Sequence, residues 1–310
     1  MRLRSLIATV LIAACAHAAG AAGQNDCKKP LYLTFDTGHM EVAPLVAEVL
    51  KRQQVRATFF GANERTKEGD GSLGNHWAPW WKAGAAEGHA FASHTIDHAY
   101  WRGDVKEPKG VATQFRIRPS AGPQEGRESV VDAAGYCTHI RAASQRLQDI
   151  TGQKTLPLFR APGGKTSPAL LAAARSCGFA HVGWAPAGFL GDELPSETFP
   201  NTVLLQKALR DIRAGDILLA HLGIWSRKDP WAPAVLEPLI AGLKEKGFAL
   251  KPCAHTQITR PGLRRTRGQV INGCLRMKST QGMRGASHRA PNCLQALWIQ
   301  GVKGPQRPAS

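Results

Sequence analysis

The sequence lacks three features that would have defined its class directly. The apolar run Leu6–Cys15 is much shorter than the roughly 20 residues that a membrane-spanning helix needs. None of the seven cysteines form a closely spaced pair of the kind found in zinc knuckles. Residues 251–310 contain no Asp or Glu at all. These absences argue against a transmembrane segment and against a structural zinc held by cysteines.

The net charge of +17 comes mainly from the two ends of the chain. Residues 251–310 carry 11 Lys or Arg, and Arg2 and Arg4 add two more, which leaves about +4 for the rest. A mildly basic body gives no reason to expect a nucleic-acid partner. The composition of 251–310 predicts a poorly ordered tail. This tail could bind an anionic surface, be a passive extension, or be an out-of-frame read-through.

Residues 1–24 are typical of a secretory signal peptide. Arg2 and Arg4 form a positive start, Leu6–Cys15 is the apolar core, and Ala16-His17-Ala18 offers a cleavage site. An alternative is that Ile12-Ala13-Ala14-Cys15 is a lipobox and Cys15 a lipid anchor. Either interpretation predicts an exported protein, periplasmic or secreted.

An oxidising compartment permits disulfides. Apart from Cys15, the chain has six cysteines, which allow 15 pairings, and the sequence does not choose between them. Cys177 lies in an apolar helical pattern and is predicted to be a buried thiol.

Residues 25–250 alternate between strand and helix patterns. The predicted strands are 31–35, 55–60, 89–93, 156–159, 179–184, 217–220 and 248–250. The predicted helices are 42–53, 78–87, 129–150, 167–177, 202–213 and 233–246. Prolines interrupt 100–127, which is predicted to be an irregular insertion. Seven strands with intervening helices favour a parallel α/β barrel, with reactive residues at the carboxyl ends of its strands.

Polar residues follow four of these strands. Asp36 and Thr37 follow the first, His94 and His98 the third, Arg160 the fourth, and His221 the sixth. Each has an ordinary explanation when taken alone: an Asp can cap the next helix, a His can be an unligated core residue, and an Arg can form a surface ion pair. Their recurrence at strand ends predicts that they meet on one face.

In this order and spacing, the segments resemble motifs of the polysaccharide deacetylase family, which shares the NodB homology domain and is similar to carbohydrate esterase family 4. Four of its five motifs are recognisable, and the remaining one is only partly present around Trp184. The four segments are Thr34-Phe35-Asp36-Thr37-Gly38, His94-Thr95-Ile96-Asp97-His98, Arg160-Ala161-Pro162-Gly163 and Leu218-Leu219-Ala220-His221.

The resemblance covers about 29–250. It implies a distorted (β/α)7 barrel and a metal-assisted hydrolase of carbon–nitrogen bonds other than peptide bonds. The implied reaction removes N-acetyl groups from a polysaccharide or oligosaccharide, so an N-acetylated glycan is the expected partner.

The resemblance also implies roles for individual residues. Asp36 would be the catalytic base, Arg160 would orient it, and His221 would be the general acid. His94 and His98 would bind a divalent metal, commonly zinc. The predicted substrate-binding residues are Trp184, Leu219 and Pro162.

Two departures from the family pattern weaken these expectations. Thr37 stands where the family has a second Asp as metal ligand, and a hydroxyl brings no negative charge to a dication. His39 could supply a nitrogen in its place. The partial motif also lacks the carboxylate that tunes the general acid, and Asp192 could replace it only if its loop folds back. The alternatives are a catalytically impaired carbohydrate-binding barrel and a metal-independent hydrolase of another amide.

Overall fold

The computed structural model describes residues 29–105, 113–224 and 227–253, and the bounds below refer to this part of the chain. The predicted signal peptide and almost all of the basic tail lie outside the described residues. Among those described, no helix combines the length and apolar character needed to cross a membrane.

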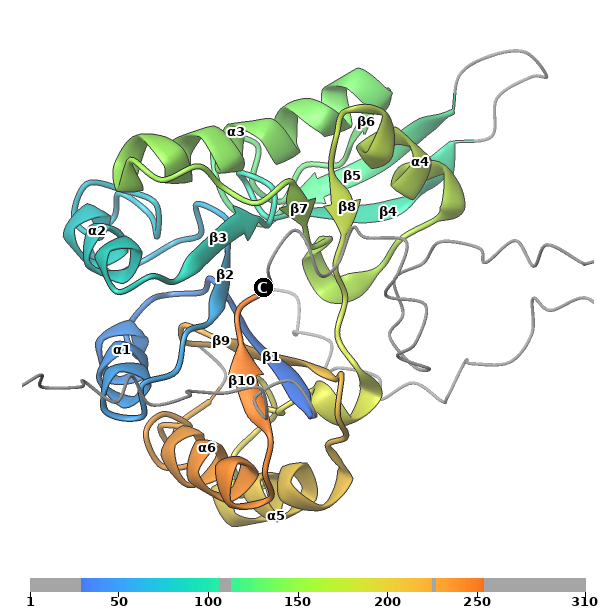
Figure 1. Ribbon diagram of the computed structural model, residues 1–310. Coiled ribbons are helices and arrows are strands. Elements are labelled where there is room, and N and C mark those ends of the chain that lie inside the picture. Colours follow the sequence, from blue (N-terminus) through green and yellow to red (C-terminus); the bar gives the residue numbers. More distant parts are fainter. Residues whose placement is uncertain (1–28, 106–112, 225–226, 254–310) are drawn as a thin grey trace, which may run out of the picture. The chain divides into compact units, whose positions relative to one another are not determined.

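A parallel sheet of seven strands forms the centre of the molecule (Figure 1). Its strands are β1 (Pro30–Asp36), β2 (Thr58–Gly61), β3 (Ala90–Ser93), β7 (Leu158–Phe159), β8 (Ala180–His181), β9 (Ile217–His221) and β10 (Ala249–Lys251). β1 pairs along one edge with β9, and along the other with β10 and then β2. From β2 the order continues through β3 and β7 to β8.

The segment after β8 returns to β9 and closes the ring without regular strand pairing. The Ala185 N–H donates to the Ile217 carbonyl at 3.0 Å, and the Leu190 N–H donates to the Leu219 carbonyl at 3.1 Å. A short 3₁₀ turn, η3 (Pro186–Gly188), lies between these two contacts. The predicted fold class, a distorted parallel barrel, is therefore confirmed.

Side chains of β1 alternate between two environments, as the two-residue period of a strand requires. Leu31, Leu33 and Phe35 belong to the main apolar cluster with the surrounding helices. Tyr32 belongs to a separate cluster with residues of β2, β3 and β9. Asp36 has the same parity as Tyr32. The strand that ends in Asp36 is thus buried on both faces, which explains its nearly continuous apolar sequence.

Six helices surround the sheet (Figure 1). They are α1 (Ala43–Arg52), α2 (Ala78–Ala86), α3 (Ala133–Thr151), α4 (Pro168–Ser176), α5 (Asn201–Asp211) and α6 (Leu236–Glu245). In α1 the buried residues include Val46, Val49 and Leu50, a spacing that places them on one side of the helix. Ser167 caps the start of α4, since its hydroxyl accepts a hydrogen bond from the Leu170 N–H.

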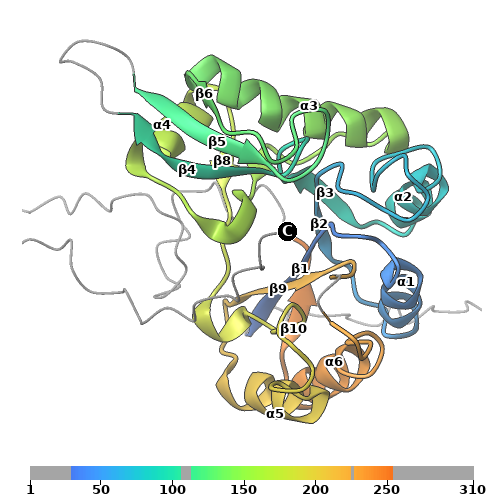
Figure 2. The same ribbon diagram turned by 180° about the vertical axis from the view of Figure 1, so that it is seen from behind.

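The prediction of an irregular insertion over 100–127 is wrong. β4 (Ala99–Val105), β5 (Gln114–Pro119) and β6 (Ser129–Val131) form a separate antiparallel sheet in order β4-β5-β6. In both views this sheet lies beside α3 (Figures 1 and 2). β5 alternates buried and exposed residues along Gln114–Pro119, a period-two signal that the prolines concealed. The predicted helix start at 129 was also too early, because β6 occupies 129–131 and Asp132 caps α3.

The prediction that Cys177 is a buried thiol is also wrong. Cys177, at the end of α4, forms a disulfide with Cys137 in α3. Packing of these two helices brings the two Cα atoms to 6.2 Å, within the usual range for a disulfide. The free buried cysteine of the described residues is Cys253.

Candidate active site

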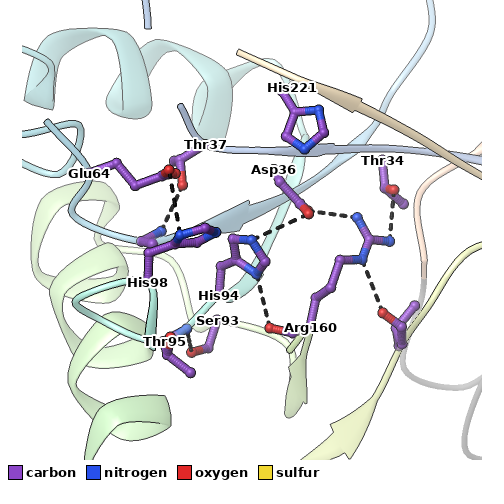
Figure 3. A network of polar contacts seen from close by, with 12 residues as sticks. Thr34, Asp36, Thr37, Glu64, Ser93, His94, Thr95, His98, Arg160 and His221 are labelled. Atoms are coloured by element: carbon purple, nitrogen blue, oxygen red, sulfur yellow. Dashed lines mark hydrogen bonds and ion pairs between the residues drawn. The ribbon is translucent and has the colours of Figure 1, made fainter. Parts of the chain in front are cut away.

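The register of the sheet brings the predicted residues to the same end of the barrel (Figure 3). Asp36 on β1 is the direct partner of His221 on β9. Ser93 on β3 pairs with Phe159 on β7, so His94 and Arg160 each follow a paired residue by one position. Parallel strands carry all four side chains to their carboxyl ends, as predicted from the sequence.

Asp36 and Arg160 form a buried ion pair. Arg160 Nη1 donates to Asp36 Oδ1 at 2.6 Å, and Nη2 donates to Thr34 Oγ1 at 2.9 Å. Arg160 Nε donates to the Val182 carbonyl, and the guanidinium lies 4.2 Å from the centre of the Phe60 ring. Burial alone would raise the pKa of Asp36, but Arg160, together with nearby histidines, outweighs that effect and lowers it. Asp36 is therefore held as an ionised carboxylate in a fixed position.

His94 is oriented by the backbone of Arg160. Its Nδ1 lies 2.9 Å from the Arg160 carbonyl oxygen, which can only accept, so Nδ1 carries the proton. Burial lowers the pKa of His94 to about 4, against the opposing effect of Asp36, and the ring is neutral at physiological pH. Its Nε2 lone pair then faces Asp36 Oδ2 at 3.4 Å. The His94 Nε2 lone pair and the Asp36 Oδ2 oxygen are both acceptors, and a cation between them would be favourable.

His98 lies beside His94, with 4.7 Å between the ring centres. Its Nδ1 is hydrogen-bonded to Ser120 Oγ at 2.6 Å, which leaves Nε2 for another ligand. The loop between the two histidines is tight rather than helical, because Thr95 and His98 both have positive φ. The Thr95 hydroxyl accepts from the Ala99 N–H and holds this conformation. Non-glycine residues with such backbone angles are concentrated at functional sites.

Thr37 and His39, the other two candidate ligands, each accept a hydrogen bond from a backbone N–H. Thr37 Oγ1 accepts a hydrogen bond from the Ala62 N–H at 3.0 Å and links the ends of β1 and β2. His39 Nδ1 accepts a hydrogen bond from the Glu41 N–H, and this contact holds the ring in the turn after β1. Within 29–105, 113–224 and 227–253, no three His, Cys, Asp or Glu side chains are already grouped to hold a metal ion.

His221 is backed by Asp192, the residue that the sequence offered only conditionally. A parallel β-bridge between Phe189 and Leu219 places the loop after β8 alongside β9. The Asp192 carboxylate accepts from the His221 backbone N–H at 2.6 Å and lies 3.1 Å from His221 Nδ1. Burial alone would lower the pKa of His221, but Asp192, together with Asp36 and Glu193, outweighs it and raises the pKa to about 10. A cavity of about 140 Å³ adjoins this pair.

The predicted substrate-binding residues come from three different segments. Leu219 is buried and has the same strand parity as His221, two residues away. Trp184 is half-buried, and its ring lies 5.7 Å from the Arg160 guanidinium. Pro162 begins the short turn η2 (Pro162–Gly164) directly after Arg160. All three flank the residues described above, and their contact with a substrate stays a prediction.

Sequence reasoning missed one further acidic residue at this end of the barrel. Glu64 lies in the loop after β2, and its Oε1 is 3.8 Å from His98 Nδ1 (Figure 3). It belongs to none of the recognised motifs. The rule that polar residues follow strand ends could have found it, because it comes three residues after the end of β2.

The fold and the positions of these groups define the class of protein: a parallel-barrel enzyme with a paired carboxylate and histidine at the carboxyl ends of its strands. A sequence model of the polysaccharide deacetylase family matches residues 23–182, just over half of the chain. The chain belongs to the polysaccharide deacetylase family. The predictions of this family and of a hydrolase acting on carbon–nitrogen bonds other than peptide bonds are therefore confirmed.

Individual relatives agree with this assignment. A chitooligosaccharide deacetylase of Azorhizobium caulinodans is 25% identical over 234 residues, which are 72% of this chain and 91% of that protein. Two solved structures share the fold. A peptidoglycan N-acetylglucosamine deacetylase has a TM-score of 0.52 at 20% identity, covering 73% of this chain and 87% of the other. A mutant of a CE4 family pseudoenzyme with restored enzymatic activity has a TM-score of 0.51 at 19% identity, covering 74% and 67%.

Proposed function

We propose that this protein is an exported, metal-assisted deacetylase that removes N-acetyl groups from N-acetylglucosamine oligosaccharides or polysaccharides. The observation that carries the proposal is the pairing of Asp36 with His221 across β1 and β9, beside the histidine pair. Such a placement provides a base and an acid on one reacting group. The similarity to a chitooligosaccharide deacetylase supports the glycan as substrate.

In this proposal Asp36 accepts the proton of the attacking water. Its ionisation is secured by Arg160, which contacts one carboxylate oxygen and leaves the other facing His94. A carboxylate with a lowered pKa is a weak base. A divalent ion held by His94 and His98, zinc or a similar metal, would lower the pKa of the water and polarise the acetyl carbonyl.

His221 donates the proton that the departing amine nitrogen needs. The Asp192 carboxylate faces Nδ1, so Nε2 is the atom that donates. With a pKa of about 10 the imidazolium persists through neutral pH. Trp184, Leu219 and Pro162 would border the acetyl group and limit the access of further water. In the net reaction, water adds to the carbonyl carbon, the C–N bond breaks, and acetate and a free amine leave.

Export is supported by the signal-like residues 1–24 and by the Cys137–Cys177 disulfide, which requires an oxidising compartment. Expression of the full chain with its own N-terminus, followed by fractionation and N-terminal sequencing, tests this. Uncleaved protein confined to the cytoplasm would contradict export, and a lipid-modified Cys15 would identify the anchored form.

Thr37 favours a second candidate, a barrel that binds glycans but turns over poorly. The first experiment to separate the two is acetate release from N-acetylglucosamine oligomers, with Asp36→Asn as the blank. The assay is run untreated, after chelation, and after addition of zinc or cobalt. Loss on chelation and recovery with metal supports the proposal. Release that is indifferent to chelator indicates a metal-independent hydrolase, and binding without release indicates the impaired barrel.

A further inference from the structure

Thr37 stands where this family carries its third metal ligand, a carboxylate, and the Thr37 hydroxyl already makes a hydrogen bond that holds the fold together. It accepts the Ala62 N–H and thereby ties β1 to the start of the loop after β2. Thr37 is also fully buried, and its own N–H donates to the Phe60 carbonyl. A metal site built on His94 and His98 alone would carry no anionic ligand from this loop.

Glu64 brings a carboxylate to the same place from the loop after β2. Figure 3 shows its side chain next to Thr37 and above the His98 ring. Its Oε1 lies 3.8 Å from His98 Nδ1, at the outer limit of an ion pair. Its Oε2 is buried and has no hydrogen-bond partner among the described residues. A buried carboxylate oxygen without a donor is destabilising, so this oxygen needs a partner that the described residues do not provide.

The backbone fixes Glu64 against the histidine loop. The Asn63 N–H donates to the Ile96 carbonyl at 2.6 Å, which joins the loop after β2 to the loop that carries both histidines. Ser72 closes the other side, since its hydroxyl accepts from the Glu64 N–H at 2.9 Å and its N–H donates to the Glu64 carbonyl. These contacts fix the backbone at Glu64, so only its side chain, which has three rotatable bonds, can move toward a bound ion.

We propose that Glu64 supplies the missing carboxylate and completes, with His94 and His98, a two-histidine, one-carboxylate site for a divalent cation of the zinc or cobalt class. The inference rests on the metal-assisted function proposed above. The donor set fits, because two neutral imidazoles and one carboxylate suit such metals. The Glu64 side chain must rotate on binding, since no three ligating side chains in the described part of the chain are already grouped for an ion.

Zinc binding to the purified mature chain, measured by isothermal titration calorimetry, tests this without relying on activity. We expect Glu64→Gln to weaken zinc binding by at least about 100-fold, because a ligand should matter no less than outer-shell residues, which cost 10–100-fold. The matched control is Glu128→Gln, a half-exposed carboxylate that pairs only loosely with Arg116 and should bind as the wild type does.

Two further measurements separate ligation from simple folding effects. Without metal, Glu64→Gln should be at least as stable as the wild type, because it removes a buried charge that has no donor on one oxygen. Adding zinc should raise the Tm of the wild type but not that of the variant. The visible absorption of the cobalt-loaded protein should weaken or shift in Glu64→Gln.

Restoring the family's residue provides the rescue. The Thr37→Asp/Glu64→Gln double variant should recover most of the zinc affinity lost in the single variant. If Glu64→Gln binds zinc as tightly as the wild type while His94→Ala does not, Glu64 is not a ligand, although the metal-assisted function stands. If the wild type binds neither zinc nor cobalt, both the inference and the metal part of the proposed function are wrong.

Discussion

The Asp192 carboxylate contacts His221 at two points, the backbone N–H at 2.6 Å and the ring Nδ1 at 3.1 Å. It therefore fixes both the position of the ring and its charge. The contact is made across 29 residues of sequence, by a loop that runs along β9 through the Phe189–Leu219 bridge. The orientation of His221 thus depends on a residue that none of the recognised motifs includes.

Replacing Asp192 by Asn should move the alkaline limit of activity to lower pH. Burial lowers the pKa of His221, but Asp192, with Asp36 and Glu193, raises it to about 10. Without the charge of Asp192, only Asp36 and Glu193 oppose burial, and the pKa of His221 should fall. The pH profile of kcat/KM for acetate release measures this directly. Asp211→Asn, which removes a partly exposed carboxylate at the end of α5, is the control and should leave the profile unchanged. An alkaline limb that stays in place in Asp192→Asn would show that His221 is not the acid.

Removing Arg160 should destabilise the fold as well as the site. Arg160→Met leaves Asp36 buried without its cation, and breaking a buried pair in this way costs about 3–5 kcal/mol. Denaturant unfolding measures the loss. Arg52→Met is the control, because Arg52 forms an exposed pair with Glu237, which should contribute no more than about 1 kcal/mol.

The double variant Asp36→Asn/Arg160→Met makes this test specific. It should be more stable than Arg160→Met alone, because the uncompensated charge is gone. Equal stability of the single and double variants would mean that Arg160 acts through its contacts with Thr34 and Val182 rather than through Asp36.

The sequence predicted all seven parallel strands and the end of the barrel where the site lies, because both depend on local signals. Apolar runs that end in a polar residue define the strands, and the parallel topology then places those residues together. Strand ends were less accurate: β7 and β8 contain two residues each, where longer strands were predicted.

The features that could not be predicted depend on contacts between distant segments. The Cys137–Cys177 disulfide needs α3 packed on α4, and the Asp192–His221 contact needs the loop after β8 folded onto β9. The prolines at 119 and 123 predict breaks and so conceal the β4–β6 sheet, whereas Pro119 is the last residue of β5.

Loss of the disulfide should lower the free energy of unfolding by about 4 kcal/mol, the value expected when a loop of this length is no longer closed in the unfolded chain. The two cysteines are 40 residues apart, and the loop includes most of α3. The variant is Cys137→Ala/Cys177→Ala, compared with the wild type by denaturant unfolding under non-reducing conditions. The control is Cys253→Ala, at a buried free thiol: adding reductant should lower its free energy of unfolding by as much as it lowers that of the wild type. Identical unfolding of the double variant and the oxidised wild type would contradict the disulfide.

Gly38→Ala should reduce activity far more than its size suggests. A Cβ at Gly38 would overlap the carbonyl oxygen of Gly223, which is backbone and already accepts the His39 N–H. The ends of β1 and β9 would have to separate, and with them Asp36 and His221, which the sheet holds in register. A displacement of about 1 Å can cost on the order of 100-fold in rate, so we expect at least that loss in kcat.

The matched control is Gly84→Ala in α2, where an added Cβ would lie at an ordinary 3.6 Å from its nearest neighbour, a ring atom of His89. That variant should be fully active and more stable by up to about 1 kcal/mol, because Ala favours the helix. If both glycine variants keep full activity, the spacing between the two strand ends does not control the reaction, and Asp36 and His221 need not act on the same substrate group.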